Sequence, residues 1–300
     1  MNKNILRITL CLFFIFLAGY LSSSLEAMGW PSRDAVLVNN FGTNNRGKPV
    51  MGMVFGGGTN VIAAESGEVI FSRSANDIKS GFAASRLPSP LGAWTAIDHG
   101  DGLISIYSRY DDNGNQLKSS SVEKDDVIAA PGISGWSIRR GFYFMLFDRW
   151  ERRWINPAMI ITPIQETRAP QIISVELRNA QGNTVQSNNL TQGRYRVLVN
   201  AAGGTSIRAA QGAGQYAPHR IVCSVNGAEV GSLNFEAVSA RDGTLMVTRN
   251  GLVPARQVYA NSPAFEAAEI FLTRGQVTLE VIVQDISGAS RSIINRLFVN

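Results

Sequence analysis

The fold of the first half of this chain is decided by the sequence Trp94-Thr-Ala-Ile-Asp-His-Gly-Asp-Gly-Leu-Ile-Ser-Ile-Tyr-Ser-Arg-Tyr110. Apolar and polar residues alternate on both sides of a short Asp/Gly-rich segment that contains Gly100 and Gly102. Alternation with a period of two is typical of β-strands, and a break of this composition between two such runs predicts a β-hairpin.

A second diagnostic run is Phe142-Tyr-Phe-Met-Leu-Phe147, which is apolar or aromatic at every position. Such a run predicts either a strand buried on both faces or a strand that lines a groove. Between the two runs, residues 122–135 have an alternating, Gly-containing sequence, and Ile155-Asn-Pro157 follows them.

The order of these pieces resembles the lysostaphin/LytM-like zinc endopeptidases, which cut peptidoglycan cross-links and share a β-fold called the duplicated hybrid motif. The resemblance covers roughly Phe41 to Pro157 and includes Gly52, His99-Gly100 and Tyr107. It implies an all-β fold in which a lysostaphin-like domain occupies residues 30–165.

The catalytic residues of that family are absent from the matching positions. The three zinc ligands, His, Asp and His, fall on Val50, Val54 and Phe144. The two further His, which polarise the substrate and orient the attacking water, fall on Arg109 and Phe142. The resemblance therefore implies a degenerate member of the family.

These replacements predict that no zinc is bound and that no other cofactor is used. Zinc in proteins is held by imidazole, carboxylate or thiolate groups, which Val and Phe lack, and Arg109 carries a permanent positive charge. Without a metal there is no activated water. The whole chain has two His, His99 and His219, and both have an ordinary structural interpretation as turn or surface residues. We therefore expect a pseudoenzyme with no catalytic residues.

Two interpretations of the altered centre remain open. In the first, apolar side chains fill the former cleft as a plug. In the second, they line a groove that grips a partner, in which case the loop 74–91 is a candidate for selecting that partner. The residues that we expect to contribute to a groove or partner surface are Tyr107, Arg139, Arg140, Trp150 and Trp154. Paired Arg and Trp are favoured at interfaces, although they also occur in solvated hairpins.

The chain begins with Lys3 and Arg7, then an apolar run, then small residues up to Ala27. This arrangement predicts a secretory signal peptide over residues 1–27, with no membrane span after its removal. We therefore expect an exported protein of the periplasm or cell envelope of a bacterium. Net charge is +5, and +4 after residue 27, which is only mildly basic. Export and the lack of a basic helix disfavour nucleic acid as a partner. Cys223 would be the single Cys of the mature chain, and we expect it to be buried in a strand.

The second half, residues 168–300, begins after a Pro-bounded linker, 162–170, and contains short alternating segments separated by turn signals. This pattern predicts a β-sandwich, and its last strands resemble those of immunoglobulin-like bacterial domains. The segments predicted as strands are 171–178, 194–200, 219–225, 243–248, 258–261, 276–285 and 291–299.

Taken together, these observations predict an envelope protein that acts by binding. The partner expected from the resemblance is peptidoglycan or a cell-wall hydrolase, which the protein would activate or localise. Two alternatives remain. One is an active zinc endopeptidase whose ligands are misaligned here, and the other is a structural envelope protein with neither partner.

Overall fold

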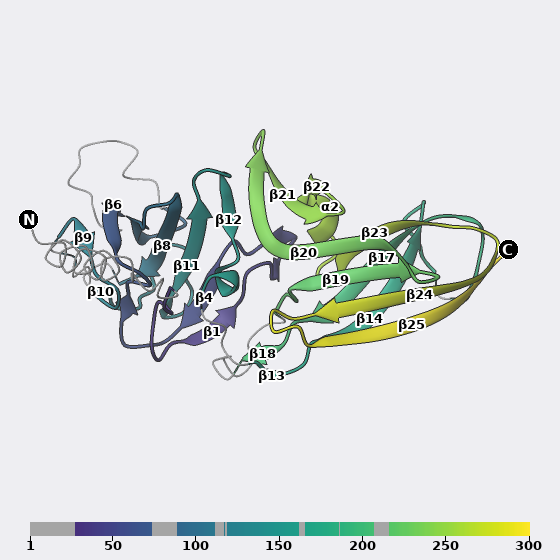
Figure 1. The fold of residues 1–300 in the computed structure, drawn as a ribbon, viewed down its shortest axis with the longest axis horizontal. Coiled ribbons are helices and arrows are strands. Elements are labelled where there is room, and N and C mark those ends of the chain that lie inside the picture. The colour runs from purple at the N-terminus through teal and green to yellow at the C-terminus, as the bar shows by residue number, and fades with distance from the viewer. Residues whose placement is uncertain are drawn as a thin grey trace, which may run out of the picture.

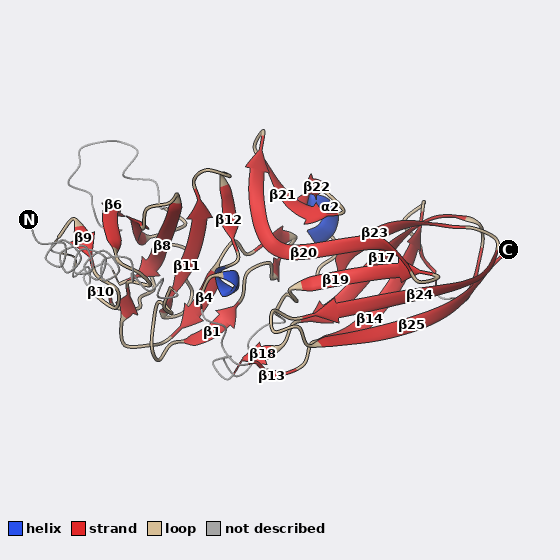
Figure 2. Ribbon diagram, in the orientation of Figure 1, coloured by secondary structure: helices blue, strands red, loops and turns tan. Residues whose placement is uncertain are grey.

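A computed structural model describes residues 28–73, 89–111, 117, 119–161, 166–185, 187–206 and 216–300. The predicted signal peptide, most of the loop 74–91 and part of the linker 162–170 lie outside these residues. The predicted all-β class is confirmed, because almost every element is a strand (Figures 1 and 2). Within the described ranges, no helix has both the length and the apolar character that crossing a bilayer requires.

The first half contains short strands and a few long ones around the predicted hairpin. The hairpin is formed by β7 (Ala93–Asp98) and β8 (Leu103–Tyr110), and its turn is closed by a hydrogen bond from Leu103 N to Gly100 O. The other elements are β1 (Val36–Asn39), β2 (Asn44–Asn45), β3 (Lys48–Pro49), β4 (Met53–Gly56), β5 (Val61–Ile62), β6 (Gly67–Arg73), β9 (Ser121–Val122), β10 (Val127–Ala129), β11 (Gly141–Asp148), β12 (Arg153–Ile155) and a 3-10 helix, Pro157–Met159.

Strand β11 is the centre of this half. It pairs along one edge with β8 and along the other with β4 and then β12, all antiparallel. Its residues from Gly141 to Leu146 are all buried. The interpretation of this run as a strand buried on both faces is therefore confirmed.

The second half is a β-sandwich whose two sheets enclose one apolar core. One sheet contains β16 (Asn189–Leu190), β25 (Ser290–Val299), β24 (Gly275–Gln284), β19 (Arg220–Val225), β20 (Ala228–Arg241), β21 (Thr244–Arg249) and β22 (Leu252–Pro254). The other contains β15 (Thr184–Val185), β14 (Gln171–Asn179), β17 (Gly193–Ala202) and β23 (Phe265–Leu272). Outside both sheets are β13 (Glu166–Arg168), β18 (Thr205–Ser206) and helix α2 (Ala255–Tyr259).

Six of the seven predicted strands of this half are present. The exception is 258–261, which is wrong because Val258 and Tyr259 end helix α2 and bury their side chains in the core. The sequence analysis also missed the long strand β20 and the strand β23. Cys223 lies in β19 and is free and buried, as expected.

The two halves share one continuous sheet. Strand β12 of the first half pairs with the end of β20, where Trp154 faces Val238. Strand β20 reaches this far because its pairing with β21 is interrupted between Asn234 and Val238, where the strand curves (Figure 1). The backbone ladder therefore crosses from one half to the other.

Asparagine side chains fix the same junction. Asn40 donates from Nδ2 to Ala217 O at 2.8 Å and accepts at Oδ1 from Ala217 N at 2.9 Å. Asn156 donates to Phe235 O at 2.9 Å, and Tyr216 donates to Leu37 O at 2.7 Å. Because these bonds satisfy backbone groups that the contact buries, the junction resembles a protein interior more than a flexible linker.

We predict that Asn40→Ala destabilises the protein by about 2–4 kcal/mol, because it leaves both the N–H and the C=O of buried Ala217 without partners. Urea unfolding followed by circular dichroism measures the effect. Asn45→Ala, at an exposed position of β2, is the matched control and should change the free energy of unfolding by less than about 0.5 kcal/mol. Equal effects of the two variants would contradict the role given to Asn40.

Candidate functional site

One face of the first-half sheet carries the altered centre, and strand register defines it. Tyr143 lies opposite Ser108 and Val54, Met145 lies opposite Ile106, and Ile106 lies opposite Ala96. Residues opposite one another in antiparallel strands project to the same side. We call this side the cleft face; its members are Val50, Val54, Trp94, Ala96, Ile104, Ile106, Tyr143, Met145, Phe147 and Trp154.

Two residues that were predicted at the altered centre do not lie on the cleft face. Phe142 and Phe144 lie on the other side of β11: Phe142 stacks on Phe55 with ring centroids 4.9 Å apart, and Phe144 contacts Tyr107 at 5.2 Å. The residues of β11 that share a face with Val50 and Val54 are Tyr143 and Met145. The error is a shift of one residue, which in a strand exchanges the two faces.

The centre of the cleft face is filled. Val50 is 7% exposed, Tyr143 7% and Met145 2%. The Tyr143 hydroxyl accepts a hydrogen bond from Met51 N at 2.9 Å, which holds the chain before β4 down on the sheet. A Cβ on Gly52 would lie 2.3 Å from Phe144 O, so only glycine allows this approach. The plug interpretation therefore describes the centre.

Arg109 is brought to the same face by an irregularity in β8. Its φ is +64°, and the pairing of β7 with β8 shifts between Ala93 and Trp94, so that Arg109 is passed over in the ladder. Its guanidinium lies 5.0 Å from the centroid of the Tyr143 ring, a cation–π contact, and its Nε donates to Pro90 O. Partial burial lowers the pKa of Arg109, but a guanidinium remains a cation at neutral pH.

None of these positions offers the donors that zinc needs. Val50 and Val54 have no donor atoms, Met145 has only a thioether, and the Tyr143 hydroxyl is already used by Met51. A fixed positive charge at Arg109 adds repulsion for a metal ion. Elsewhere in the described residues, no group of three or more His, Cys, Asp or Glu is gathered so that it could hold a metal. The family's zinc therefore does not fit this face.

His99 belongs to a buried hydrogen-bonded chain. Its Nδ1 contacts Ser66 O at 2.8 Å and its Nε2 contacts Ser105 Oγ at 2.7 Å. Ser105 Oγ in turn donates to the Tyr107 hydroxyl, which accepts from Ala64 N at 2.8 Å. Both ring nitrogens are thus engaged, which supports a structural role. Burial lowers the pKa of His99 and raises the pKa of Tyr107 to about 12.

The residues expected at a partner surface are not gathered in one place. Tyr107 is fully buried, so its expected place in a groove is wrong. Trp154 packs on Phe147 at 4.9 Å and lies at the junction with β20. Arg139 and Arg140 are exposed in the loop before β11, and Trp150 is 69% exposed in the turn after it.

The sequence analysis missed an aromatic pair at the edge of the cleft face. Phe71 of β6 stacks on Trp94 of β7, with centroids 4.2 Å apart and planes at 24°. Phe71 is 44% exposed and Trp94 is partly exposed. The alternation around Trp94 pointed to a strand, but only the pairing of β6 with β7 shows that the two rings meet.

Comparisons with known proteins give distant likenesses. A protein-family model matches residues 169–300. No curated protein matches the chain. One similar solved structure is the catalytic domain of a mutant of the prophage-encoded M23 protein EnpA from Enterococcus faecalis, at 19% identity, covering 43% of this chain and 94% of that one, with a TM-score of 0.35.

Two further solved structures are similar to this chain at comparably low identity. The SpoIIQ-SpoIIIAH pore forming complex matches at 17% identity over 46% of this chain and 92% of that one, with a TM-score of 0.36. The catalytic domain of lysostaphin from Staphylococcus simulans matches at 16% identity over 37% of this chain and 77% of that one, with a TM-score of 0.29. Likenesses at this level carry no argument about activity.

We predict that Gly52→Ala destabilises the protein by more than about 2 kcal/mol, since the new methyl group would overlap the backbone of β11. The free energy of unfolding in urea measures it. Gly57→Ala is the control for steric overlap: Gly57 has a positive φ, which Gly52 does not, but no atom lies within 4 Å of its added Cβ. Its cost should stay near 1 kcal/mol, the approximate price of a left-handed residue. A smaller effect at Gly52 than at Gly57 would contradict the plug.

We also predict that stability falls between pH 7 and pH 5 in a way that depends on His99. Burial lowers the pKa of His99 in the folded protein, while the hydrogen bond to Ser66 O and the charges of Glu65 and Asp98 oppose that shift more weakly. As pH falls through about 6.5, the unfolded chain takes up a proton that the folded protein resists. The contribution of the neutral His99 to stability is therefore fully present above that pH and decreases below it.

The measurement is the free energy of unfolding of the wild type and of His99→Gln at several pH values in this range. The variant should be less stable at pH 7, and its free energy of unfolding should depend less on pH. His219 is present in both proteins, so its contribution cancels in the comparison. Parallel curves would show that His99 does not contribute.

Proposed function

We propose that this chain is an exported, catalytically inactive peptidase-like protein of the cell envelope that acts by binding peptidoglycan or a cell-wall hydrolase. The observation that carries the proposal is the composition of the cleft face: Val50, Val54 and Arg109, three positions that the resemblance matches to metal ligands or catalytic His, lie there beside Tyr143 and Met145.

The packing of the cleft face argues against hydrolysis of a peptide at its centre. A substrate would need space beside β11, yet Met51 and Gly52 occupy that space, and Met51 N donates a hydrogen bond to the Tyr143 hydroxyl. Hydrolysis also needs a group that activates water, and the central side chains are hydrocarbon, a thioether, a phenol and a guanidinium. The alternative of a zinc endopeptidase with misaligned ligands is not favoured by this geometry.

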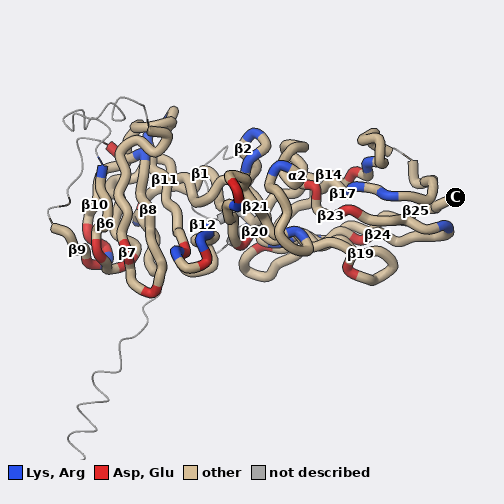
Figure 3. Tube along the Cα trace, turned by 90° about the horizontal axis from the view of Figure 1, so that it is seen from above, with Lys and Arg blue, Asp and Glu red and all other residues tan. Residues whose placement is uncertain are grey.

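The edge of the cleft face favours binding. The stacked pair Phe71–Trp94 is accessible, and Phe147 with Trp154 forms a second aromatic pair on the same face. Stacking restrains each ring, so little conformational freedom is lost when a partner covers it. Trp, Tyr and Arg are also the residue types that contribute most at interfaces. Charged residues of both signs are interspersed along the two halves (Figure 3), which does not by itself select an acidic partner.

The two partner classes lead to different roles. Binding to peptidoglycan would hold the protein at the wall, and binding to a hydrolase would make it an activator or scaffold. A structural envelope protein with neither partner is the remaining alternative, and the same experiment separates all three.

We predict that the Phe71→Ala/Trp94→Ala double variant loses most of the partner binding shown by the wild type, because it removes the accessible aromatic pair. Retention on purified sacculi measures binding to peptidoglycan. Crosslinking in cells, followed by identification of the captured protein, measures binding to a hydrolase. Phe271→Ala removes another exposed aromatic ring, 58% exposed on β23, and is the matched control.

If the double variant and the control were retained on sacculi, or captured a partner, to the same extent, the cleft face would not be the binding surface. Absence of both sacculus retention and a hydrolase partner would favour the structural alternative. Stoichiometric zinc in the purified wild type, together with cross-link cleavage that a chelator abolishes, would contradict the proposal that the protein is catalytically inactive.

A further inference from the structure

Three of the four most exposed large apolar side chains of the described residues lie in the loop between β10 and β11. Ile138 is 94% exposed, Trp136 70% and Ile133 69%, and Arg139 and Arg140 follow them directly and are exposed as well. Single apolar residues on a protein surface are ordinary, but a cluster of them marks a place where the protein contacts something else. We call residues 133–140 the apolar loop.

The two ends of the apolar loop are joined to each other. Gly132 N donates to Gly141 O at 2.8 Å, and Gly141 N donates to Gly132 O at 2.9 Å. A reciprocal pair of this kind places the two Cα atoms about 5.5 Å apart. The eight residues between them therefore form a closed excursion from the sheet, and their apolar and basic side chains are held within one small area at the start of β11.

Hydrogen bonds hold the apolar loop in one shape. Ser134 Oγ donates to Tyr110 O at 2.7 Å, and Ser137 Oγ donates to Arg139 O at 2.7 Å. Trp136 N donates to a backbone carbonyl of the segment before β7, at 3.2 Å. Both serine hydroxyls are thus used within the protein, which lowers the cost of moving the loop from water into a less polar medium.

The arginines of the apolar loop differ from those at the other end of the same sheet. None of the ion pairs among the described residues includes Arg139 or Arg140. At the far end of β11, by contrast, Arg149 pairs with Asp98 at 3.2 Å, and acidic residues gather around the strand turns there (Figure 3). The loop arginines are therefore available to an anion outside the protein.

The carboxylates near the base of the apolar loop do not cancel its charge. Asp111 follows β8 directly, and Asp34 precedes β1 and accepts from Thr59 N and Oγ. Arg109 lies at the same end of the sheet and adds a third guanidinium to the two of the loop. Three arginines thus face two carboxylates, one of which is already bonded, so this end of the first half attracts anions.

We propose that the apolar loop docks the protein on the surface of a lipid bilayer that contains anionic headgroups. Ile133, Trp136 and Ile138 enter the boundary between the headgroups and the acyl chains, where Trp is enriched in membrane proteins. Arg139 and Arg140 contact the phosphate groups of the lipids. The proposal goes beyond the function proposed for the cleft face and does not rest on it.

The shape of the apolar loop favours a bilayer over a protein as its partner. A side chain that is 94% exposed, as Ile138 is, projects clear of its neighbours, so a protein partner would need a pocket matched to it. A bilayer accepts a projecting side chain without such a pocket. Eight residues are also far fewer than the roughly 20 to 30 that each side contributes to a standard protein interface.

The probes are vesicles of phosphatidylcholine and phosphatidylglycerol in about a 2:1 ratio, which are anionic, and vesicles of phosphatidylcholine alone, which are neutral. Co-sedimentation of the full chain, after removal of the predicted signal peptide, measures the partition coefficient. We expect binding to the anionic vesicles at low salt and at least about tenfold weaker binding to the neutral ones. Binding to the anionic vesicles should fall as the NaCl concentration rises.

Trp136→Ala tests the apolar part of the loop. It should weaken binding to the anionic vesicles at least about fivefold, because the indole no longer enters the bilayer. The melting temperature should not change, since the side chain is mostly exposed. Trp150→Ala is the matched control: Trp150 is 69% exposed and lies in the turn at the other end of β11, so this variant should bind vesicles like the wild type.

The Arg139→Gln/Arg140→Gln double variant tests the charge. It should weaken binding to the anionic vesicles at least about tenfold and leave the weaker binding to the neutral vesicles unchanged. The Arg291→Gln/Arg296→Gln double variant is the matched control, because it removes the same charge from two exposed positions of β25 in the second half. It should bind the anionic vesicles like the wild type.

Three results would overturn the proposal. The first is a wild type that does not sediment with the anionic vesicles at low salt. The second is equal weakening by a loop variant and its control, which would show only a general attraction. The third is a Trp136→Ala variant that binds vesicles like the wild type but no longer crosslinks to a protein in cells. Retention on sacculi is measured separately, so failure here leaves the function proposed for the cleft face untouched.

Discussion

Pairing of β11 along both of its edges is the constraint on which the first half depends. Because neighbouring strands fix its backbone, each of its side chains must take one of two faces, and neighbouring residues cannot share one. Phe142, Phe144 and Leu146 build the core with Tyr107 and Phe55. Tyr143 and Met145 are left for the cleft face, with Arg109 placed beside Tyr143 by the irregularity in β8.

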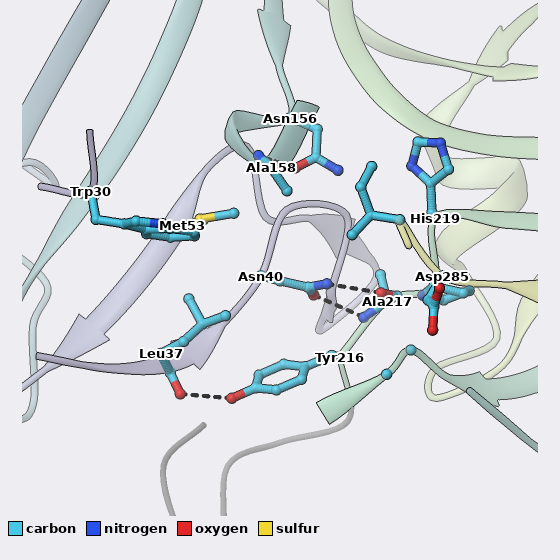
Figure 4. A pocket seen from close by; sticks show the side chains of 14 residues that line it. Trp30, Leu37, Asn40, Met53, Asn156, Ala158, Tyr216, Ala217, His219 and Asp285 are labelled. Atoms are coloured by element: carbon cyan, nitrogen blue, oxygen red, sulfur yellow. Dashed lines mark hydrogen bonds between the residues drawn. The ribbon is translucent and has the colours of Figure 1, made fainter. Parts of the chain in front are cut away.

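The same kind of pairing joins the two halves. Because β12 pairs with β20, the position of the cleft face relative to the sandwich is set by a backbone ladder together with the bonds of Asn40 and Asn156. A partner that contacts Phe147 and Trp154 therefore lies close to the second half. A cavity of about 60 Å³ lies between the two halves for the same reason, since its walls come from both halves and keep a fixed separation (Figure 4).

Prediction from sequence succeeded where a local pattern determines the structure. The segment from Asp98 to Gly102 can hardly form anything other than a turn, and Asp101, Gly100 and Gly102 do adopt positive φ there. It failed where the information is not local. A run that is apolar at every position does not reveal which residues face which side, so Phe142 and Phe144 were assigned to the wrong face. Val258 and Tyr259 are residue types common in strands, yet the short helix α2 buries both.

The features of the candidate site also differ in how far they can be predicted from the sequence. The absence of metal-donor atoms from Val50 and Val54 could be predicted from the sequence, since it depends only on residue type. The stack of Phe71 on Trp94 could not, because it joins two strands whose register depends on the folded sheet.

The packing of the cleft face also bears on how readily such a face could acquire a metal site. A His placed at position 50 or 145 would bury an imidazole among Ile106, Ala96 and the other apolar members, where no acceptor or metal would yet offset its desolvation. An Asp at position 54 would lie opposite Tyr143 and near Arg109, which would pair with it and compete with a metal. Each ligand therefore costs stability until the full set is present. Such a surface is expected to change through the exposed aromatic edge, where substitutions alter binding and leave the plug intact.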